Sequence, residues 1–342
     1  MILTVAIPTY NRPEKVLDTV RLLLPQLNDT VKVLILDNHS EVDVHQYLHQ
    51  HLQAAQLTRV IVVRHKVNIG PDANFARCFE LCDTEFIWTL GDDDLIEPNA
   101  VELILNEIAL FSENDVVGFN FKSNCCKASR SKPVVLNSIS DFVTRLDDFG
   151  ALLFLSAGVY KVKTYLQYIR LVTWGGYTMA SQLIPAMMAI SKGSAFILSE
   201  KYIVTNVPEP DHDKGWSPVQ LALGLSAILE APVGYKGNEY KEFGLRIAAH
   251  FNCLYPLDAM FIIIRSLNNN IDKIDNYHIY LFNQVILKTF EFRDRKVNQR
   301  IQYHMALRLL KNKSILKLLF KLYPKLWQRT AKVAPFSLFR RD

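Results

Sequence analysis

The sequence predicts an α/β fold, with a mixed, mainly parallel sheet covered by helices on both faces and a mostly helical C-terminal extension. Three observations carry this prediction. Short apolar runs rich in β-branched residues alternate with segments of helical apolar spacing, polar clusters follow the first four runs, and helical spacing dominates from Val219 onward. Such alternation is typical of βαβ units and parallel sheets. We therefore predict a first domain at residues 1–218 and a helical region at 219–342.

The first four strands are expected at residues 2–7, 31–36, 60–64 and 85–90, where apolar runs end in polar or turn-forming residues. The helices between them are expected at residues 13–27, 40–55 and 72–82. The first of these helices repeats its apolar residues at Val16, Leu17, Val20, Leu23 and Leu24, which is one face of a helix. Pro98 is expected to open the next helix.

Later elements follow the same patterns. Residues 116–121 are predicted as a strand, 125–141 as a polar connection and 195–204 as another strand. Residues 147–188 read as mainly helical, with Ala151 to Val159 in the core. Residues 208–216 are predicted as a long loop because they contain two prolines, acidic residues and a glycine.

The composition is that of an ordinary globular protein. The 342 residues are 49% hydrophobic and 21% charged, with a net charge of +5, so disorder along the whole chain is excluded. The five cysteines show no paired CxxC spacing, and Cys78 and Cys82 are expected in the core of a protein from a reducing compartment. The sequence shows no signal-peptide pattern and no run of 18 apolar residues, so we expect a cytoplasmic protein without a spanning helix.

Polar clusters end the four predicted strands, at residues 9–12, 37–40, 68–70 and 92–94. The carboxyl ends of parallel strands lie at one edge of a sheet, and ligands of open α/β sheets bind beyond that edge. Four successive polar clusters therefore favour a binding site at this edge over simple solvation of loops.

Three consecutive carboxylates, Asp92 to Asp94, follow the apolar run 86–88. Adjacent acids repel one another, and Mg²⁺ or Mn²⁺ can compensate their charge while keeping ligand positions open for substrate phosphate. The cluster therefore suggests chemistry on a phosphate-activated substrate. The alternative is a turn in which the Asp side chains bond their own backbone and cap the next helix.

Taken together, these motifs resemble glycosyltransferase family 2, which has the GT-A fold, and in particular bacterial O-antigen and surface-polysaccharide glycosyltransferases. The resemblance rests on residues 5–12, 37–40, 68–70 and 91–94, and covers about residues 2 to 110. It implies a nucleotide-diphosphate sugar donor, a glycan acceptor, a divalent cation (Mn²⁺ or Mg²⁺) and usually inversion at the anomeric carbon.

The resemblance also implies roles for individual residues. The nucleotide-sugar is expected at Pro8, Thr9, Tyr10, Asn11, Arg12, Asp37, Asn38, Asn68, Arg77 and Asp92. Asp93 is expected to be the main metal ligand, with contributions from Asp92 and Asp94. Arg77 fits a solvated helix position equally well.

Two positions depart from the family pattern in this region. Gly91 stands where the family usually has an Asp, and Asn38 stands where many members have the acid that reads the base. An Asn can accept the N3 proton of uracil or thymine, or donate to N3 of cytosine. The nucleotide therefore stays open among UDP, dTDP, CDP and GDP.

The general base is a further departure. The family usually supplies an Asp or Glu shortly after a Gly-Gly turn, but residues 175–182 contain no carboxylate. Asp211, His212 and Asp213 are the candidates, in a loop between Pro210 and Trp216 that either closes over the sugar or is simply solvated. Trp174 and Trp216 either stack on a sugar ring or lie in the core.

The C-terminal end, residues 311–342, is a basic amphipathic segment. Lys313, Lys317, Lys321 and Lys325 recur every four residues among Leu, Ile and Phe, and residues 308–341 contain ten Lys or Arg and no acid. Such a segment either lies on an anionic membrane surface or packs on the protein with its lysines in water. The first alternative fits a peripheral location on the inner face of the cytoplasmic membrane. It also fits an acceptor linked to polyprenyl diphosphate, which only the resemblance to family members that assemble surface polysaccharides implies.

The leading hypothesis is a metal-dependent, inverting glycosyltransferase that adds one sugar to a lipid-linked glycan in surface polysaccharide synthesis. The alternative is a catalytically degenerate relative that binds a glycan or a membrane partner, since the carboxylate near Gln182 is missing. A nucleotidyltransferase would need a Gly-rich basic phosphate loop, which residues 8–12 do not provide. No nucleic-acid recognition motif is evident, so nucleic acid is not expected as a partner.

Overall fold

The structure is a computed structural model that describes residues 1–124, 130–146, 149–175, 180–205, 228–250, 256–267, 269–280, 282–283, 297–323 and 325. The chain divides into two compact units. The first comprises Met1–Gly176 and Ser181–Glu209, and the second comprises Tyr177–Ala180 and Pro210–Asp342. The predicted division at residues 218 and 219 lies outside the described residues and stays a prediction.

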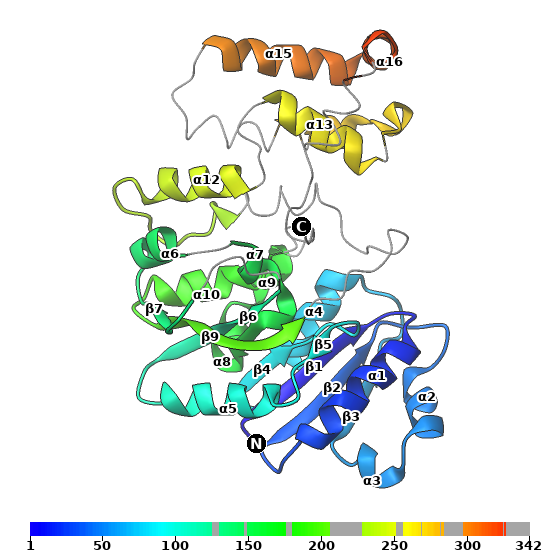
Figure 1. Ribbon diagram of the computed structural model, residues 1–342, viewed down its shortest axis with the longest axis vertical. Helices are drawn as coiled ribbons and strands as arrows, with labels where there is room; N and C mark the ends of the chain where they lie inside the picture. Colours follow the sequence, from blue (N-terminus) through cyan, green and yellow to red (C-terminus); the bar gives the residue numbers. More distant parts are fainter. Residues whose placement is uncertain are drawn as a thin grey trace. The chain divides into compact units, whose positions relative to one another are not determined.

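The first unit is built on a nine-stranded sheet in the order β3-β2-β1-β4-β8-β6-β9-β5, with β7 also paired to β9. Strands β3, β2, β1 and β4 are parallel neighbours, as the βαβ alternation predicts. Figure 1 shows β1 between β2 and β4. The strands are β1 Leu3–Thr9, β2 Val31–Asp37, β3 Val60–Arg64, β4 Phe86–Thr89, β5 Leu95–Ile96, β6 Val116–Ser123, β7 Val134–Leu136, β8 Gly158–Lys161 and β9 Ala195–Thr205.

Helices cover both faces of this sheet, which confirms the predicted fold class. The α-helices of the first unit are α1 Pro13–Leu23, α2 Val44–His51, α3 Ala54–Leu57, α4 Pro71–Glu80, α5 Ala100–Leu110, α6 Ile139–Arg145, α7 Phe149–Leu153, α8 Val162–Gln167, α9 Ile169–Trp174 and α10 Leu183–Ile190. Short 3₁₀ helices lie at η1 Leu24–Gln26 and η2 Leu155–Ala157.

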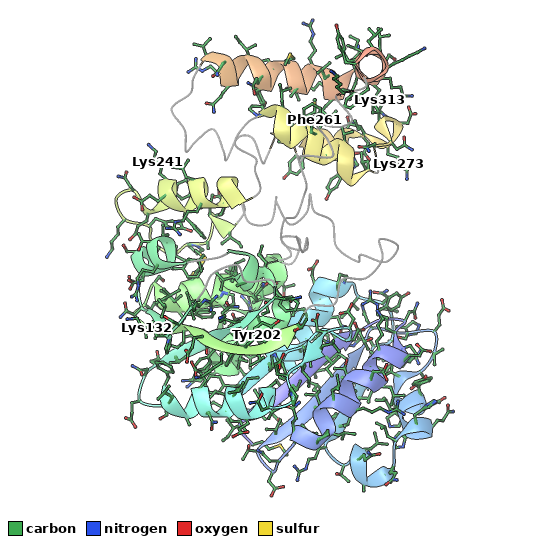
Figure 2. The ribbon with its side chains drawn as sticks, in the orientation of Figure 1. Lys132, Tyr202, Lys241, Phe261, Lys273 and Lys313 are labelled. Carbon is green, nitrogen blue, oxygen red and sulfur yellow. The ribbon has the colours of Figure 1, made fainter. Side chains whose placement is uncertain are left out.

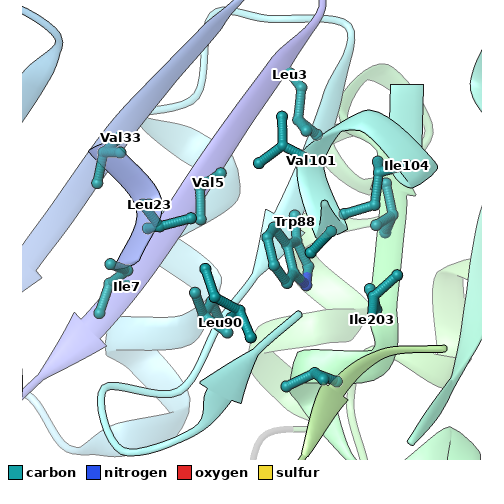
Figure 3. Packing of buried hydrophobic residues seen from close by; sticks show 14 of the residues in the cluster. Leu3, Val5, Ile7, Leu23, Val33, Trp88, Leu90, Val101, Ile104 and Ile203 are labelled. Atoms are coloured by element: carbon teal, nitrogen blue, oxygen red, sulfur yellow. The ribbon is translucent and has the colours of Figure 1, made fainter. Parts of the chain in front are cut away.

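The alternation of side chains along β1 divides the core between the two faces. Leu3, Val5 and Ile7 belong to a fully buried cluster that includes apolar residues of α1 and α5 (Figure 3). The indole of Trp88 is buried in the same cluster, and its Nε1 donates to the carbonyl of Ser156 at 2.8 Å. Phe79 of α4 stacks on Tyr165 of α8 with ring centroids 4.5 Å apart. Cys78 and Cys82 are buried, as predicted.

The sequence reading missed three strands. β5 lies just before the helix expected from Pro98, which begins instead at Ala100 with Asn99 as its N-cap. β7 and the start of α6 lie within the predicted polar connection at 125–141, and β8 interrupts the predicted helical stretch at 147–188. Because these strands have only two to four residues, their apolar spacing is too short to define a period.

The helix predicted at 40–55 is also divided. α2 ends at His51 because Leu52 is extended, and a capping box between Gln53 and Gln56 starts the separate helix α3. The other predicted helices agree within a few residues. The first ends as a 3₁₀ turn at residues 24–26.

Gly158 is the position in β8 where the sheet tolerates no side chain. A Cβ there would lie 2.1 Å from the hydroxyl oxygen of Tyr160, which is itself buried. We expect Gly158→Ala to destabilise the protein by about 3 kcal/mol, because the neighbours of an extra methyl group in a packed core must shift. Urea unfolding measures this cost, and Gly193→Ala, which meets no atom within 4 Å but has a positive φ, gives the purely conformational comparison. Equal costs for the two variants would contradict the packing explanation.

In its described part, the second unit is helical, as the sequence predicts. Its α-helices are α12 Glu239–His250, α13 Pro256–Ser266, α15 Val297–Lys311 and α16 Lys313–Leu322, with a 3₁₀ turn at η4 Ile271–Lys273. The rings of Phe261 on α13 and Phe320 on α16 meet edge to face with centroids 6.2 Å apart. Figure 2 labels Phe261 and also Lys313, which donates to the carbonyl of Asp272 at 2.8 Å.

None of the described helices is both long enough and apolar enough to cross a bilayer.

Candidate active site

The carboxyl ends of the parallel strands bring the predicted polar clusters to one edge of the sheet. Thr9 pairs with Asp37 across β1 and β2, and Asp37 pairs with Arg64 across β2 and β3. On the other side of β1, the amide of Leu90 donates to the carbonyl of Ala6 at 2.9 Å, so the acidic loop starts beside the same strand.

Asp92 is a buried carboxylate of the acidic loop, with 6% of its surface exposed. Thr9 Oγ1 donates to its Oδ2 at 2.6 Å, and Arg12 Nη1 donates to its Oδ1 at 3.2 Å. Its backbone carbonyl accepts from Thr19 Oγ1 at 3.0 Å. Burial raises the pKa of Asp92 above its usual value, although the bond from Thr9 and the charge of Arg12 act in the opposite direction. These contacts fix the loop against β1 and α1.

Arg12 joins the first motif to the acidic loop. Its Nη1 lies 3.0 Å from Oδ2 of Asp93 as well as 3.2 Å from Oδ1 of Asp92. Burial lowers the pKa of the guanidinium, but the attraction of the two acids outweighs it, so the pKa of Arg12 is raised and its charge is secure. The site therefore already contains one positive charge.

Asp94 is held by Ser156 of η2. Its Oδ2 accepts from Ser156 Oγ, and Ser156 Oγ in turn accepts from the amide of Gly91 at 2.8 Å. A Cβ at Gly91 would lie 2.6 Å from Asp94 Oδ2 and 3.2 Å from Asp93 Oδ1. The departure from the family pattern at position 91 therefore has a physical reason, because Asp94 occupies the space that a side chain at 91 would need.

Asp37 is fully buried, with none of its surface exposed. Its Oδ1 accepts from the amide of Ser40 at 2.8 Å, and its Oδ2 lies 3.8 Å from Nε of Arg64 without a hydrogen bond of its own. Arg64 also donates to the carbonyl of Ser40 at 2.7 Å. Asp37 thus holds the loop after β2, and its contact with the nucleotide stays a prediction.

Asn38 links the second and third motifs. Its Nδ2 donates to Asn68 Oδ1 at 2.9 Å, and its Oδ1 accepts from the amide of Ile69 at 2.9 Å. Only 3% of Asn38 is exposed. Both amide atoms are therefore engaged with the loop after β3, where an approaching base would have to compete for them.

The remaining residues that were predicted to bind the nucleotide differ in their positions and contacts. Asn11 has φ 56° and bonds the loop after β2 through its amide, which donates to Ser40 Oγ at 2.8 Å. Tyr10 is 45% exposed at the edge. Pro8 lies within β1, in register with Leu36. Arg77, on α4, pairs with Glu80 at 3.4 Å, which is the contact of an ordinary helix residue, although its Nε is buried without a partner.

The acids fit a divalent cation that takes most of its ligands from substrate. Among the described residues, no group of three His, Cys, Asp or Glu side chains is placed to hold a metal ion by itself. Mg²⁺ sites commonly use one or two carboxylates together with substrate phosphates, so this donor set is sufficient. The side chain of Asp93 is 28% exposed and that of Asp92 is 7% exposed, so Asp93 is the more accessible of these two carboxylates.

The candidate bases Asp211, His212 and Asp213, together with Trp216, lie outside the described residues. Gln182, near the position where the family usually has a carboxylate, is described and is buried, with 1% of its surface exposed. Its Nε2 donates to the carbonyl of Leu152 at 3.2 Å, and its own carbonyl accepts from the hydroxyl of Tyr165. Gln182 therefore has a packing role.

Three residues of the site escaped the sequence reading. Thr19 lies on the buried face of α1, Ser156 lies in η2 and Arg64 ends β3, and each binds a loop far away in the sequence. The position of Arg64 at a strand end was the available signal. Nothing in the local sequence marks Thr19 or Ser156.

Comparison with known proteins decides the family. Residues 4–157 match the sequence model described as glycosyl transferase family 2. These residues are those of a family 2 glycosyltransferase domain. The matched residues include every contact among Thr9, Arg12, Asn38, Asp92 and Ser156 given above, and the predicted resemblance and enzyme class are confirmed.

Two relatives of this glycosyltransferase domain have names that describe enzymes acting on carbohydrates. The abequosyltransferase RfbV of Salmonella typhimurium is 26% identical over 128 residues, which are 37% of this chain and 38% of that protein. The chondroitin synthase of Escherichia coli is 33% identical over 106 residues, which are 31% of this chain and 15% of that protein. The chain thus matches well under half the length of either relative.

Solved structures confirm the GT-A fold. Residues 1–349 of S. aureus TarS superpose with a TM-score of 0.56 at 14% identity, covering 91% of each chain. The mannosyltransferase PcManGT from Pyrobaculum calidifontis, in complex with GDP-Man and Mn²⁺, gives a TM-score of 0.51 at 14% identity, covering 97% of this chain and 85% of that one. At this identity the likeness concerns the fold alone.

Proposed function

We propose that the protein transfers one sugar from a nucleotide-diphosphate sugar to a hydroxyl of a glycan acceptor. The observation that carries the proposal is the cluster of Thr9, Arg12, Asp92 and Asp93 at the carboxyl edge of the sheet in a family 2 domain. The complexes of PcManGT with GDP-Man and Mn²⁺ and of TarS with UDP-GlcNAc support a nucleotide-sugar donor by their fold.

Each residue of the cluster has a separate role in the proposed reaction. Thr9 and Thr19 hold Asp92, which keeps the acidic loop against β1. Asp93 offers its carboxylate to a divalent cation, Mn²⁺ or Mg²⁺, which would stabilise the diphosphate as it leaves. Arg12 supplies a permanent positive charge beside the same position, and its guanidinium is suited to binding phosphate oxygens. Asn38 and Asn68 shape the loop over which the base lies.

Transfer with inversion needs a base that takes the proton of the acceptor hydroxyl. The described residues near Gln182 supply none, so we keep Asp211, His212 and Asp213 as the proposed bases. The names of the two relatives support a polysaccharide product, and we propose a lipid-linked acceptor because the C-terminal helices fit a membrane surface, as argued below.

The test is release of nucleoside diphosphate from a panel of UDP-, dTDP-, CDP- and GDP-sugars, with Mn²⁺ or Mg²⁺ and with EDTA. Even without an acceptor, a glycosyltransferase is expected to hydrolyse its own donor slowly. Metal-dependent release from one class of donor supports the proposal. Tight nucleotide binding without release, also when glycan acceptors are added, would favour the degenerate alternative that the missing carboxylate near Gln182 keeps open.

Two lysines of the predicted C-terminal stripe make contacts within the protein. Lys317 pairs with Asp272 at 2.5 Å, and Lys313 donates to the carbonyl of the same residue at 2.8 Å. Leu316 and Phe320 are buried. Lys313 and Lys317 thus hold α16 to the η4 turn, whereas Lys321 and Lys325 of the same stripe are exposed.

A different face of these helices stays exposed. α16 exposes Ile315, Leu318 and Leu322 by 47%, 54% and 61%, and α15 exposes Val297 and Ile301 by 73% and 61%. No acidic residue occurs between Val297 and Arg341, whereas Arg and Lys recur throughout. Exposed apolar side chains in a purely cationic stretch suit an anionic membrane surface, which we propose as the partner of this face and as the reason for a peripheral location at the inner leaflet.

We expect the full chain to sediment with vesicles that contain anionic phospholipid but not with neutral ones. Leu318→Gln/Leu322→Gln should lower the partition coefficient about tenfold or more, because each buried leucine contributes on the order of 1 kcal/mol or more. The matched control is Leu22→Gln/Leu110→Gln, which changes two exposed leucines of the first unit. Equal partition of the two double variants would contradict a membrane role for α16.

A further inference from the structure

Arg12 occupies the place of a counter-ion between two acids. A single nitrogen of its guanidinium lies 3.2 Å from Oδ1 of Asp92 and 3.0 Å from Oδ2 of Asp93. The Arg12 side chain is 28% exposed, so water screens these ion pairs only in part. A positive charge at this point compensates the same carboxylates that a divalent cation would compensate.

The two acids depend on Arg12 to different degrees. Asp92 has a second side-chain partner, Thr9, and its backbone is held by Thr19. For the carboxylate of Asp93, Arg12 is the hydrogen-bond donor found among the described residues. Asp93 is also the more exposed of the two acids. Of these two acids, Arg12 therefore covers the one that is more accessible to a metal ion.

Arg12 can exchange this partner for another without leaving its place in the fold. It is the N-cap residue of α1, so its backbone is anchored while its long side chain is not part of the helix. A guanidinium binds phosphate through two parallel hydrogen bonds, and a diphosphate carries enough negative charge to compete with a carboxylate.

We propose that Arg12 makes the binding of a divalent cation conditional on the donor. Without a nucleoside diphosphate, Arg12 occupies Asp93 and repels a second cation. When the diphosphate arrives, Arg12 turns to the phosphate oxygens and Asp93 becomes free for the metal. Metal and nucleotide then bind as one unit, and by thermodynamic linkage each strengthens the other. This inference rests on the proposed function, because it requires a nucleoside diphosphate at this edge of the sheet.

The test is titration with Mn²⁺ alone, in which electron paramagnetic resonance measures the free ion, on wild type, Arg12→Met and Arg12→Lys. Arg12→Met removes the charge at similar length, and we expect it to bind Mn²⁺ about tenfold more tightly than wild type, since a partly buried opposing charge is gone. Arg12→Lys, which keeps the charge, should resemble wild type. Arg21→Met, on the exposed side of the same helix, is the matched control and should change nothing.

A structural role for Arg12 would not raise the affinity for a metal ion. If Arg12→Met binds Mn²⁺ no more tightly than wild type, or less tightly, the proposal is wrong. Circular dichroism and thermal unfolding show whether the variant folds. If the variant does not fold, the test is the Mn²⁺ affinity of the wild-type protein with and without a nucleoside diphosphate. We expect this affinity to rise at least tenfold when the nucleoside diphosphate is bound, and an unchanged affinity overturns the proposal.

Different results would overturn the proposed function and the coupling through Arg12. Absence of nucleotide binding by wild type, with and without metal, would remove the proposed function. Nucleotide binding that persists while the Mn²⁺ affinity is indifferent to it would leave the proposed function intact and remove only the coupling through Arg12.

Discussion

Asp93→Ala is expected to lower sugar transfer by about a thousandfold while leaving the fold intact. Asp93 is the accessible carboxylate of the acidic loop, and loss of a group that stabilises the leaving diphosphate costs several kcal/mol of transition-state stabilisation. Its side chain is 28% exposed and carboxylate loss removes little core packing, so the melting temperature should change little. The measurement compares kcat/KM for the preferred donor with the thermal unfolding of the same preparation.

Asp18→Ala, which removes an exposed carboxylate of α1, is the matched control and should retain full activity. A different result would favour the plain turn that competes with the metal site. If Asp93→Ala melts at a much lower temperature, and its folded fraction binds the nucleotide as wild type does, the acids are structural.

Arg64→Met should destabilise the protein by about 2 kcal/mol. Asp37 is fully buried with one oxygen unbonded, and Arg64, 3.8 Å away, is the positive charge that compensates it. Loss of one partner of a buried ion pair typically costs 3 to 5 kcal/mol, and the partial exposure of Arg64 reduces this value. Because Arg64 also binds the carbonyl of Ser40, nucleotide affinity should fall as well. Urea unfolding and nucleotide titration measure the two effects.

Two variants sharpen this comparison. Arg59→Met removes an arginine that lies just before β3 and pairs with the exposed Asp29, so its cost should be below about 1 kcal/mol. In Arg64→Met/Asp37→Asn the buried charge is also gone, and part of the stability should return. A double variant that is less stable than Arg64→Met would show that Asp37 contributes by something other than its uncompensated charge.

The parallel half of the sheet could be predicted because its strands are long and regular. β1 and β2 each have seven residues, nearly all of them buried, and helices with clear apolar faces separate them. The antiparallel half could not be predicted in the same way. β8 has four residues and depends on the space that Gly158 leaves for Tyr160, which is a three-dimensional fact without a periodic signal.

The candidate site, like the sheet, could be predicted from the sequence only in part. Strand ends placed Thr9, Asn38 and Asp92 at one edge from the sequence alone. The sequence did not predict that Asp37 and Asp92 hold loops, because their burial depends on partners such as Arg64 and Thr19 from distant segments. The same applies to Gly91, whose missing side chain is explained by Asp94 and Ser156.

Calorimetric titration of the full chain with UDP, dTDP, CDP and GDP, each with Mn²⁺ and with EDTA, tests the central claim most directly. A nucleotide-sugar site built from Arg12, Asp92 and Asp93 predicts binding of one of these nucleotides that requires the metal and is lost in Asp93→Ala. No binding of any nucleotide to the folded protein would contradict the account.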